Sequence, residues 1–280
     1  MATQSATAKI IYETDSLYHH IVVREDDQGK RYLAFNRVRG DQSAVLPGHP
    51  EVLTFAYTKT TFAALAFLEK EPKRMLFIGV GAGSIPAYMR LIYPNAHMDL
   101  VEIDGEVTRV AKEYFDFKPD ALMKESTKDG RVFLRTTENK YDFIFLDAYN
   151  DASVPFHLTT KEFLELCQDH LAPGGVLASN VWSQQINRYF NAQINTYQEV
   201  FKILYLFAAK NTGNYIFVVT NPEKNFGKSQ LAEKARAIPV PKGTLDLVNI
   251  IKTEFTAIPR SNEPTLSDDF APVDVMRHQQ

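Results

Sequence analysis

The chain has 280 residues, of which 45% are apolar, so it is long enough to bury a hydrophobic core in one large domain or two modest ones. Its 34 acidic and 31 basic residues give a formal charge of -3, which argues against a nucleic-acid partner bound through a basic surface and favours a small ligand. Cys167 is the only cysteine, which excludes an internal disulfide and a cysteine-based zinc site and fits a reducing compartment.

The N-terminal residues MATQSATAKIIYETDS lack the apolar stretch of a signal peptide. No window approaches the roughly 20 uninterrupted apolar residues of a membrane span. We therefore expect a cytoplasmic protein without membrane contact.

Residues 10–45 alternate apolar and polar side chains and break at the turn-forming sequence DDQGK, residues 26–30. This pattern predicts β-hairpins, which we assign to an N-terminal β domain over residues 1–53, with LPGHP at 46–50 close to its boundary. Residues 54–68 then carry apolar side chains at helical spacing and predict a helix that leads into the next domain.

Short, continuously apolar runs alternate with helical stretches beyond residue 72. The runs are RMLFIGV (74–80), HMDLVEI (97–103) and YDFIFLD (141–147), with one helix expected through Met89 and another over 106–114. Such runs are typical of buried parallel strands, and the alternation predicts a doubly wound α/β sheet over residues 54–222.

Two further features are expected toward the end of the chain. Residues 162–182 read as a helix that ends at Pro-Gly-Gly, followed by a strand, and residues 205–211 and 214–221 as an edge hairpin around the turn NTGN. Residues 223–280 are more polar and predict a helical appendage over 244–255 with an extended tail. The Asp268-Asp269 pair of this tail could reach the site, but we expect it to dock on the surface.

Three glycines follow the first buried run and precede a helix. Gly79, Gly81 and Gly83 occupy the place where backbone N–H groups at a helix N-terminus hold a ligand. Their G-x-G-x-G spacing departs from the dinucleotide pattern G-x-G-x-x-G and fits the tighter loop of sulfonium-cofactor enzymes. It favours a Rossmann-like fold of the S-adenosylmethionine-dependent methyltransferase type, although a tight strand-to-helix turn also explains the glycines.

Acidic residues follow the next strands. Glu102 ends the second apolar run about 20 residues after the glycines, which is the spacing of a carboxylate that holds a ribose diol. Asp104 either shares that face or caps the following helix. In Lys128-Asp129-Gly130, Asp129 either accepts a hydrogen bond from an adenine amine or is a solvated turn residue.

Asp147 ends the third apolar run, and Asn150 and Asp151 follow it in a loop. A carboxylate at this place faces the same crevice as the glycines, because ligands bind outside the carboxyl ends of the strands. Asp147 could instead cap a helix, but the residues that follow do not start one.

Together these motifs resemble the spermidine synthase family of polyamine aminopropyltransferases, in its bacterial spermidine synthase-like branch. Gly79-Val-Gly-Ala-Gly83, Glu102-Ile-Asp104, Lys128-Asp-Gly130 and Asp147-Ala-Tyr-Asn-Asp151 match in order, spacing and strand context. Phe55-Ala-Tyr57, Ala172-Pro-Gly-Gly175 and the ending 266–273 are similar as well.

The resemblance implies transfer of an aminopropyl group from decarboxylated S-adenosylmethionine to an amine such as putrescine, leaving methylthioadenosine. An alkylammonium has a pKa of about 10 and no lone pair, so its attack needs a carboxylate that accepts a proton. By resemblance that residue is Asp147, with Tyr57 beside it and Gln42 in contact with the donor. Tyr57 could alternatively be a core residue. The family also implies a homodimer or homotetramer.

Some positions depart from the family pattern. Ala82 replaces the aspartate that would hold the donor's amine, Asn150 replaces the second acidic residue of the Asp-x-x-Asp loop with Asp151 one position later, and Lys59 replaces a glutamate. We expect Asn150 and Asp151 to contact the acceptor.

Two other functions stay open. One is a methyltransferase that uses intact S-adenosylmethionine, whose carboxylate Ala82 tolerates better than an aspartate would. The other is a non-catalytic nucleoside-binding homologue, against which Asp147 argues. We expect no metal, because the histidines are scattered and the adjacent His19 and His20 face opposite sides of a strand.

Overall fold

The computed structural model describes residues 8–37, 40–149 and 154–269. Within these ranges the N-terminal strands form an antiparallel sheet in the order β1-β2-β3-β4, with bounds Lys9–Asp15, His20–Glu25, Arg31–Ala34 and Ser43–Val45. The predicted turn joins β2 to β3, and the Asp26 carboxylate accepts hydrogen bonds from the N–H groups of Gln28 and Lys30. The predicted N-terminal hairpins are therefore confirmed.

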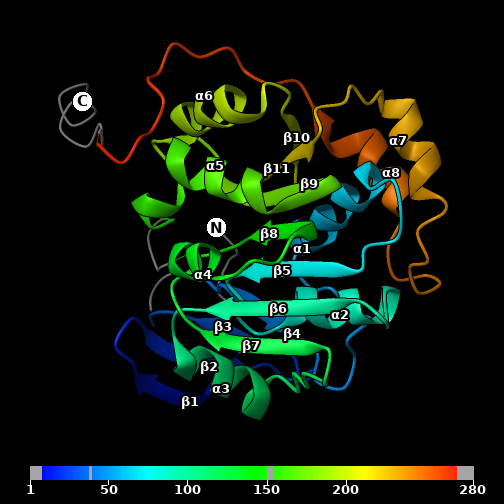
Figure 1. Cartoon of the computed structure of the whole chain (residues 1–280). Helices are drawn as coiled ribbons and strands as arrows, with labels where there is room; N and C mark the ends of the chain where they lie inside the picture. Colours follow the sequence, from blue (N-terminus) through cyan, green and yellow to red (C-terminus); the bar gives the residue numbers. More distant parts are fainter. Residues whose placement is uncertain (1–7, 38–39, 150–153, 270–280) are drawn as a thin grey trace.

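The central sheet has the strand order β12-β10-β11-β9-β8-β5-β6-β7 in the part of the chain that is described (Figure 1). The bounds are β5 Arg74–Ile78, β6 His97–Glu102, β7 Met123–Thr127, β8 Tyr141–Leu146, β9 Leu171–Trp182, β10 Tyr205–Ala208, β11 Asn214–Asn221 and β12 Phe255–Thr256. Strands β9, β8, β5, β6 and β7 run parallel, whereas β11, β10 and β12 extend the sheet in antiparallel fashion.

The chain runs outward from β5 through β6 to β7 and then returns to β8 on the other side of β5. The strand order therefore reverses between β5 and β8. In open α/β sheets ligands bind outside the carboxyl ends of the strands at such a switch point. The topology thus places a ligand site at the ends of these two strands.

Helices cover both faces of the central sheet because its strands are apolar on both sides. Met75 and Phe77 of β5 belong to the core on the face of α2, α7 and α8, whereas Leu76 and Ile78 belong to the core under α4, α5 and α6. The bounds are α1 Ala56–Thr61, η1 Phe62–Phe67, α2 Ser84–Ile92, α3 Gly105–Tyr114, α4 Gly130–Thr136, η2 Phe156–Leu158, α5 Lys161–His170, α6 Phe190–Phe201, α7 Lys228–Ala235 and α8 Leu247–Glu254. This layered arrangement confirms the predicted α/β fold.

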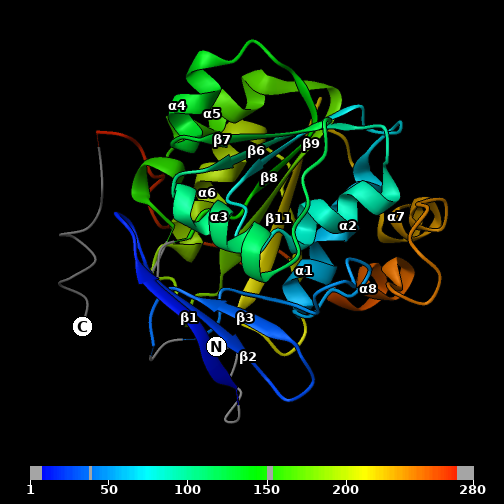
Figure 2. The same ribbon diagram turned by 90° about the horizontal axis from the view of Figure 1, so that it is seen from below.

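Helix α3 links the N-terminal sheet to the rest of the molecule. Val107 and Val110 of α3 share a small hydrophobic core with Ile21 and Leu33 of the N-terminal sheet and with Phe35, which follows β3. Figure 2 shows this sheet lying against the same end of the central domain as the strand ends. The N-terminal sheet is therefore held where it can form part of a site with the central strands.

Pro-Gly-Gly takes a different place from the predicted one. Helix α5 ends at His170 and β9 begins at Leu171, so Pro173, Gly174 and Gly175 lie inside the strand instead of in a turn before it. Gly174 has a φ of 79°, and the register with β8 shifts between Tyr141 and Phe143. The extra residues are accommodated by an irregularity of the ladder, which periodicity alone does not reveal.

The segment after residue 222 packs on the central domain. Helices α7 and α8 bury side chains in the same core as η1, the ring of Phe226 lies edge-on to that of Phe67 with centroids 5.2 Å apart, and β12 pairs with β10. Near the end, the Asp268 carboxylate binds Arg131 of α4 and accepts a hydrogen bond from the Thr160 hydroxyl. The predicted boundaries at residues 53 and 222 stay predictions, and helix α7 was not predicted.

None of the helices in the described ranges has both the length and the apolar character needed to span a membrane.

Candidate active site

A cavity of about 790 Å³ lies at the carboxyl ends of the parallel strands, against the N-terminal sheet. The loops after β5, β6, β7 and β8 line one side, and the β1–β2 turn with residues 40–43 lines the other. Small-molecule sites commonly enclose about 300–1,000 Å³. The position and volume suit a ligand of nucleoside size at the switch point.

Gly79 lies where the backbones that follow β5 and β8 approach each other. Its φ is 89°, and a Cβ at this position would lie 2.3 Å from the Asp147 carbonyl oxygen. The Asp147 N–H donates to the Ile78 carbonyl at 2.8 Å, which holds the two strand ends together. Glycine is thus required both for the left-handed backbone and for the close approach.

The other two glycines differ in their surroundings. Gly81 has a φ of 53° and lines the cavity with Gly79. Gly83 precedes α2 with a φ of 78°, is not part of the lining, and would carry a Cβ 2.4 Å from the ring of Phe117. Gly83 serves the packing of this turn, and its role in cofactor binding stays a prediction.

Glu102 presents a buried carboxylate at the end of β6. Its Oε2 accepts a hydrogen bond from the Val80 N–H at 2.9 Å, and its Oε1 accepts one from the Asp104 N–H at 3.3 Å. Burial raises the pKa of Glu102, while these backbone donors and the N–H of Gly81 oppose the rise. Each carboxylate oxygen has two lone pairs, so acceptor capacity remains for the hydroxyls of a diol.

Asp104 caps helix α3 through a hydrogen bond from the Glu106 N–H to its Oδ1 at 3.0 Å and is not part of the lining. Of the two roles considered for Asp104, the structure gives it the capping role.

Asp129 caps α4 and also faces the cavity. Its Oδ1 accepts a hydrogen bond from the Val132 N–H at 2.9 Å, and its Oδ2 lies 2.7 Å from Nε2 of His157. Burial raises its pKa, but the bonds from Val132 and His157 outweigh this and lower the pKa overall. Gly130 lines the cavity beside it and has no room for a Cβ, which would lie 2.4 Å from Ile78.

Asp147 follows β8 and is held by side chains from two other segments. Its Oδ1 accepts a hydrogen bond from Nδ2 of Asn180 at 2.8 Å, and it also interacts with the Tyr57 hydroxyl by a side-chain hydrogen bond. The Tyr57 hydroxyl additionally lies 3.3 Å from the main-chain oxygen of Gln42, which lines the cavity. Tyr57 thus faces the cavity next to Asp147 and packs with its ring on the core.

Burial raises the pKa of Asp147 to about 6, with a smaller upward effect of the Glu102 charge, while the hydrogen bonds from Asn180 and Tyr57 act in the opposite direction. A carboxylate with this pKa is ionised at neutral pH and is a stronger base than an exposed aspartate. It is suited to hold a cation and to accept a proton in the cavity.

An aromatic pair lies next to Asp147. The rings of Tyr149 and Trp182 stack with centroids 4.6 Å apart at 23°, and both line the cavity. The Tyr149 hydroxyl donates to the Asn180 carbonyl at 2.7 Å and accepts from the Trp182 N–H at 3.2 Å. Nδ2 of Asn214 donates to Oδ1 of Asn180 at 2.9 Å. Strands β9 and β11 therefore fix both the carboxylate and the aromatic rings.

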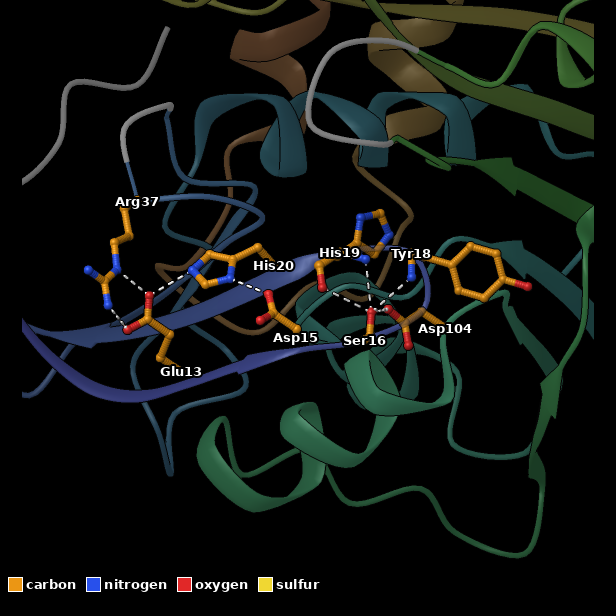
Figure 3. A network of polar contacts seen from close by, with 8 residues as sticks. All are labelled: Glu13, Asp15, Ser16, Tyr18, His19, His20, Arg37 and Asp104. Carbon is orange, nitrogen blue, oxygen red and sulfur yellow. Dashed lines mark hydrogen bonds and ion pairs between the residues drawn. The ribbon is translucent and has the colours of Figure 1, made fainter.

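The β1–β2 turn forms the N-terminal rim (Figure 3). The Ser16 hydroxyl donates to the Asp104 carboxylate and accepts hydrogen bonds from the N–H groups of Tyr18 at 3.1 Å and His19 at 2.8 Å. His19 lines the cavity and stacks on Phe35 with centroids 3.8 Å apart. The link from Ser16 to Asp104 therefore fixes the rim to the end of β6.

His20 points away from His19 into a polar cluster on the hairpin (Figure 3). Its Nδ1 lies 2.5 Å from Asp15 and its Nε2 lies 2.7 Å from Glu13, which also binds Arg37. These carboxylates, Asp15 first, raise the pKa of His20. The two adjacent histidines diverge, as the strand periodicity indicates.

The cavity brings together most of the residues selected from the sequence. The lining includes Gln42, Tyr57, Gly79, Gly81, Glu102, Asp129, Gly130 and Asp147. Asn150 and Asp151 lie outside the described residues. Lys59 is not part of the lining, and Ala82 is buried in the small core with Val107 instead of facing the cavity.

Further lining residues were not predicted from the sequence, namely Tyr149, His157, Asn180, Trp182 and Asn214. A signal for Asn180 and Trp182 was present, because they end the apolar run VLASNVW as Glu102 and Asp147 end theirs. No such signal exists for His157, which reaches Asp129 from the short 3-10 helix η2.

Among residues 8–37, 40–149 and 154–269, no cluster of three or more histidine, cysteine, aspartate or glutamate side chains is arranged to hold a metal ion.

Comparison with known proteins identifies relatives of this chain. A family model described as the spermine/spermidine synthase domain matches residues 54–225. A polyamine aminopropyltransferase of Vibrio vulnificus is 37% identical over 216 residues, which cover 75% of this chain and 71% of the relative. A probable polyamine aminopropyl transferase of Bifidobacterium longum is 29% identical, and the match covers 95% of this chain but only 62% of that protein.

Solved structures share the fold. A spermidine synthase in complex with the transition-state analogue AdoDATO has a TM-score of 0.71 at 22% identity, covering 90% of this chain and 86% of that one. Human methyltransferase-like protein 13 in complex with SAH has a TM-score of 0.61 at 23% identity, covering 78% of this chain and all of the other. The fold is therefore shared with a spermidine synthase and with a methyltransferase-like protein.

Proposed function

This chain belongs to the spermine/spermidine synthase family, and we propose on that premise that it transfers an aminopropyl group from decarboxylated S-adenosylmethionine to an amine such as putrescine. The observation that carries the proposal is the position of Asp147. It is the carboxylate with a pKa raised to about 6, it lies in the same cavity as the glycine loop and Glu102, and it is oriented by Asn180 and Tyr57.

The donor would occupy the end of the cavity formed by β5, β6 and β7. Glu102 has free lone pairs for the ribose hydroxyls, and the left-handed turn at Gly79 lets the ligand approach the backbone. Asp129 stands at the far side as an acceptor for the adenine amine, with His157 holding it in place. A sulfonium is a cation, so the carboxylates of the lining also favour the donor electrostatically.

The transfer itself is a displacement at the carbon next to the sulfonium. The acceptor binds as an ammonium beside Asp147, which takes one proton and frees the nitrogen lone pair. The nitrogen then forms a bond to the methylene carbon as the carbon–sulfur bond breaks, and the electron pair of that bond neutralises the sulfur. Methylthioadenosine and the alkylated amine leave, and Asp147 releases its proton to water.

Tyr57 and Asn180 keep the Asp147 carboxylate in one orientation during this step. Both hydrogen bonds favour the ionised form, so they keep Asp147 able to bind a cation at neutral pH. The acceptor residues Asn150 and Asp151 remain part of the proposal from the family resemblance alone. We further propose that the enzyme acts in the cytoplasm, which the lone buried Cys167 supports, and as a homodimer or homotetramer, which the family resemblance supports.

Methylation by intact S-adenosylmethionine is less well supported. Its main argument was that Ala82 would tolerate the donor's carboxylate, yet Ala82 is buried away from the cavity lining and leaves the charge of the site unchanged. The non-catalytic alternative is disfavoured by the base-like pKa and fixed orientation of Asp147.

The test is a product assay with each donor. The pure protein, incubated with putrescine and decarboxylated S-adenosylmethionine, should release methylthioadenosine and spermidine in equal amounts, and intact S-adenosylmethionine should give neither. Asp147→Asn should lower kcat by about 10²- to 10⁴-fold, the usual contribution of a general base. Asp169→Asn, on the exposed end of α5, is the matched control and should retain activity. Methyl transfer from the intact donor, or undiminished turnover by Asp147→Asn, would contradict the proposal.

A further inference from the structure

The cavity has few carboxylates left to hold a second cation. Four described carboxylates line it: Asp41, Glu102, Asp129 and Asp147. The first pairs with the buried Arg24, the second accepts backbone N–H groups, and the third is bound to His157. Asp147 is the fourth, and the proposed function assigns it to the reacting nitrogen. Within the described lining, a second ammonium of the acceptor therefore has no carboxylate of its own.

Among the described residues, the side chains that hydrogen-bond to Asp147 are the amide of Asn180 and the phenol of Tyr57. The Tyr149–Trp182 pair lies close enough to Asp147 that the negative charge of Asp147 raises the pKa of the Tyr149 hydroxyl, in addition to the larger effect of burial. Ile186, Thr212, Gly213 and Asn214 also line the cavity and carry no charge.

We propose that the stacked Tyr149–Trp182 pair binds the non-reacting ammonium group of the acceptor by cation–π contact. The assignment rests on the proposed aminopropyl transfer and specifies its acceptor as a diamine or polyamine whose distal cation lies against aromatic rings. The π face of tryptophan is the most favourable of the side chains for such contacts, especially where water is excluded.

The pair is fixed before any ligand binds. The Tyr149 hydroxyl makes one hydrogen bond to the Asn180 carbonyl and one to the Trp182 N–H, so its ring cannot swing out without breaking both. The same Asn180 donates to Asp147. One strand end thus sets the distance between the base and the aromatic pair, which selects acceptors by the spacing of their two nitrogens.

The experiment compares two acceptors of equal chain length, putrescine and n-butylamine, with decarboxylated S-adenosylmethionine as donor. The readout is the ratio of kcat/KM for the diamine to kcat/KM for the monoamine, measured by methylthioadenosine release. Trp182→Leu should lower this ratio by about 2- to 30-fold, the range that corresponds to one cation–π contact. Trp182→Phe keeps an aromatic face and should keep the ratio within about twofold.

Phe35→Leu is the matched control, because it removes an aromatic ring from the donor side of the same cavity, where Phe35 stacks on His19. A change there acts on both acceptors alike, so the ratio should stay constant. Tyr149→Leu is the second variant if Trp182→Leu does not fold, which thermal melting would show.

An unchanged ratio in the folded Trp182→Leu or Tyr149→Leu protein would overturn the proposal. So would a larger fall of the ratio in Asp151→Asn than in Trp182→Leu, because a carboxylate would then hold the distal cation. These outcomes differ from failure of the proposed function, in which the unaltered protein releases no methylthioadenosine with either amine.

Discussion

Removing the amide of Asn180 should change the pH dependence of the reaction more than its maximum rate. Asn180 donates to Asp147 at 2.8 Å and thereby stabilises the ionised carboxylate, whose pKa is about 6. A hydrogen bond to a charged group contributes about 1.5–3 kcal/mol, and one pKa unit corresponds to about 1.4 kcal/mol. In Asn180→Ala the pKa of Asp147 should therefore rise by about one to two units.

The assay is kcat/KM for the amine, measured by methylthioadenosine release from about pH 5 to about pH 9. Asp147 must be ionised to act, so activity falls as pH drops through its pKa, and the acidic limb should move to higher pH in Asn180→Ala. For a shift of about 1.5 units, the ionised fraction at about pH 6.5 falls from about three quarters to about a tenth, so kcat/KM falls about eightfold there and little at about pH 9.

Asn195→Ala is the control, since Asn195 on α6 hydrogen-bonds Ser261 and Glu263 and does not line the cavity. Its acidic limb should stay where it is. A uniform loss of activity in Asn180→Ala at every pH, with the limb unmoved, would refute the assignment of that limb to Asp147 and the role of Asn180 in setting it.

Asp147→Asn should stabilise the unliganded protein at neutral pH by up to about 3 kcal/mol. The reason is that a carboxyl whose pKa rises from 3.8 to about 6 on folding adds stability below pH 3.8, and this stability is lost as the pH rises to about 6. Urea unfolding of both proteins at about pH 4 and about pH 7 measures the difference, and an equal gain in stability at the two pH values would argue against it. Gly79→Ala should destabilise the protein by at least about 3 kcal/mol in the same assay, whereas Gly48→Ala, with a φ of 82° and open space around its Cβ, should lose only the roughly 1–2 kcal/mol of backbone strain. Glu102→Gln should weaken methylthioadenosine binding about 10- to 100-fold in calorimetry. Glu106→Gln, at a partly buried position of α3 outside the cavity lining, is the control and should leave binding within about twofold. Similar losses in both variants would show that Glu102 does not hold the ribose.

Sequence patterns located the parts of the site that follow directly from strand ends. Glu102 and Asp147 terminate apolar runs, and parallel strands bring such ends to one edge of a sheet, so their convergence could be predicted. The glycine at position 79 could be predicted for the same reason, although the contact with the Asp147 carbonyl that requires it could not.

Other parts of the site depend on strand pairing and packing that cannot be predicted from local sequence patterns. Asn214 reaches Asn180 because β11 returns antiparallel to β9, with Ile216 opposite Asn180 and Asn214 opposite Trp182. Lys59 replaces a glutamate of the family pattern, and Ala82 was expected to tolerate the carboxylate of an intact donor, but neither lines the cavity, because packing decides whether a helix or loop residue faces it. The local amino-acid pattern does not predict that packing.

The packing of α7 and α8 on η1 also determines where a truncated form of the protein can end. The family domain stops at residue 225, one position before Phe226, whose ring covers Phe67 and whose N–H donates to the Tyr205 hydroxyl at 2.7 Å. A recombinant protein that ends at residue 225 would expose hydrophobic aromatic surface to water and would be prone to aggregate during purification. Expression plasmids intended for crystallisation should instead encode the chain through at least Asp268, so that its contacts with Arg131 and Thr160 are retained.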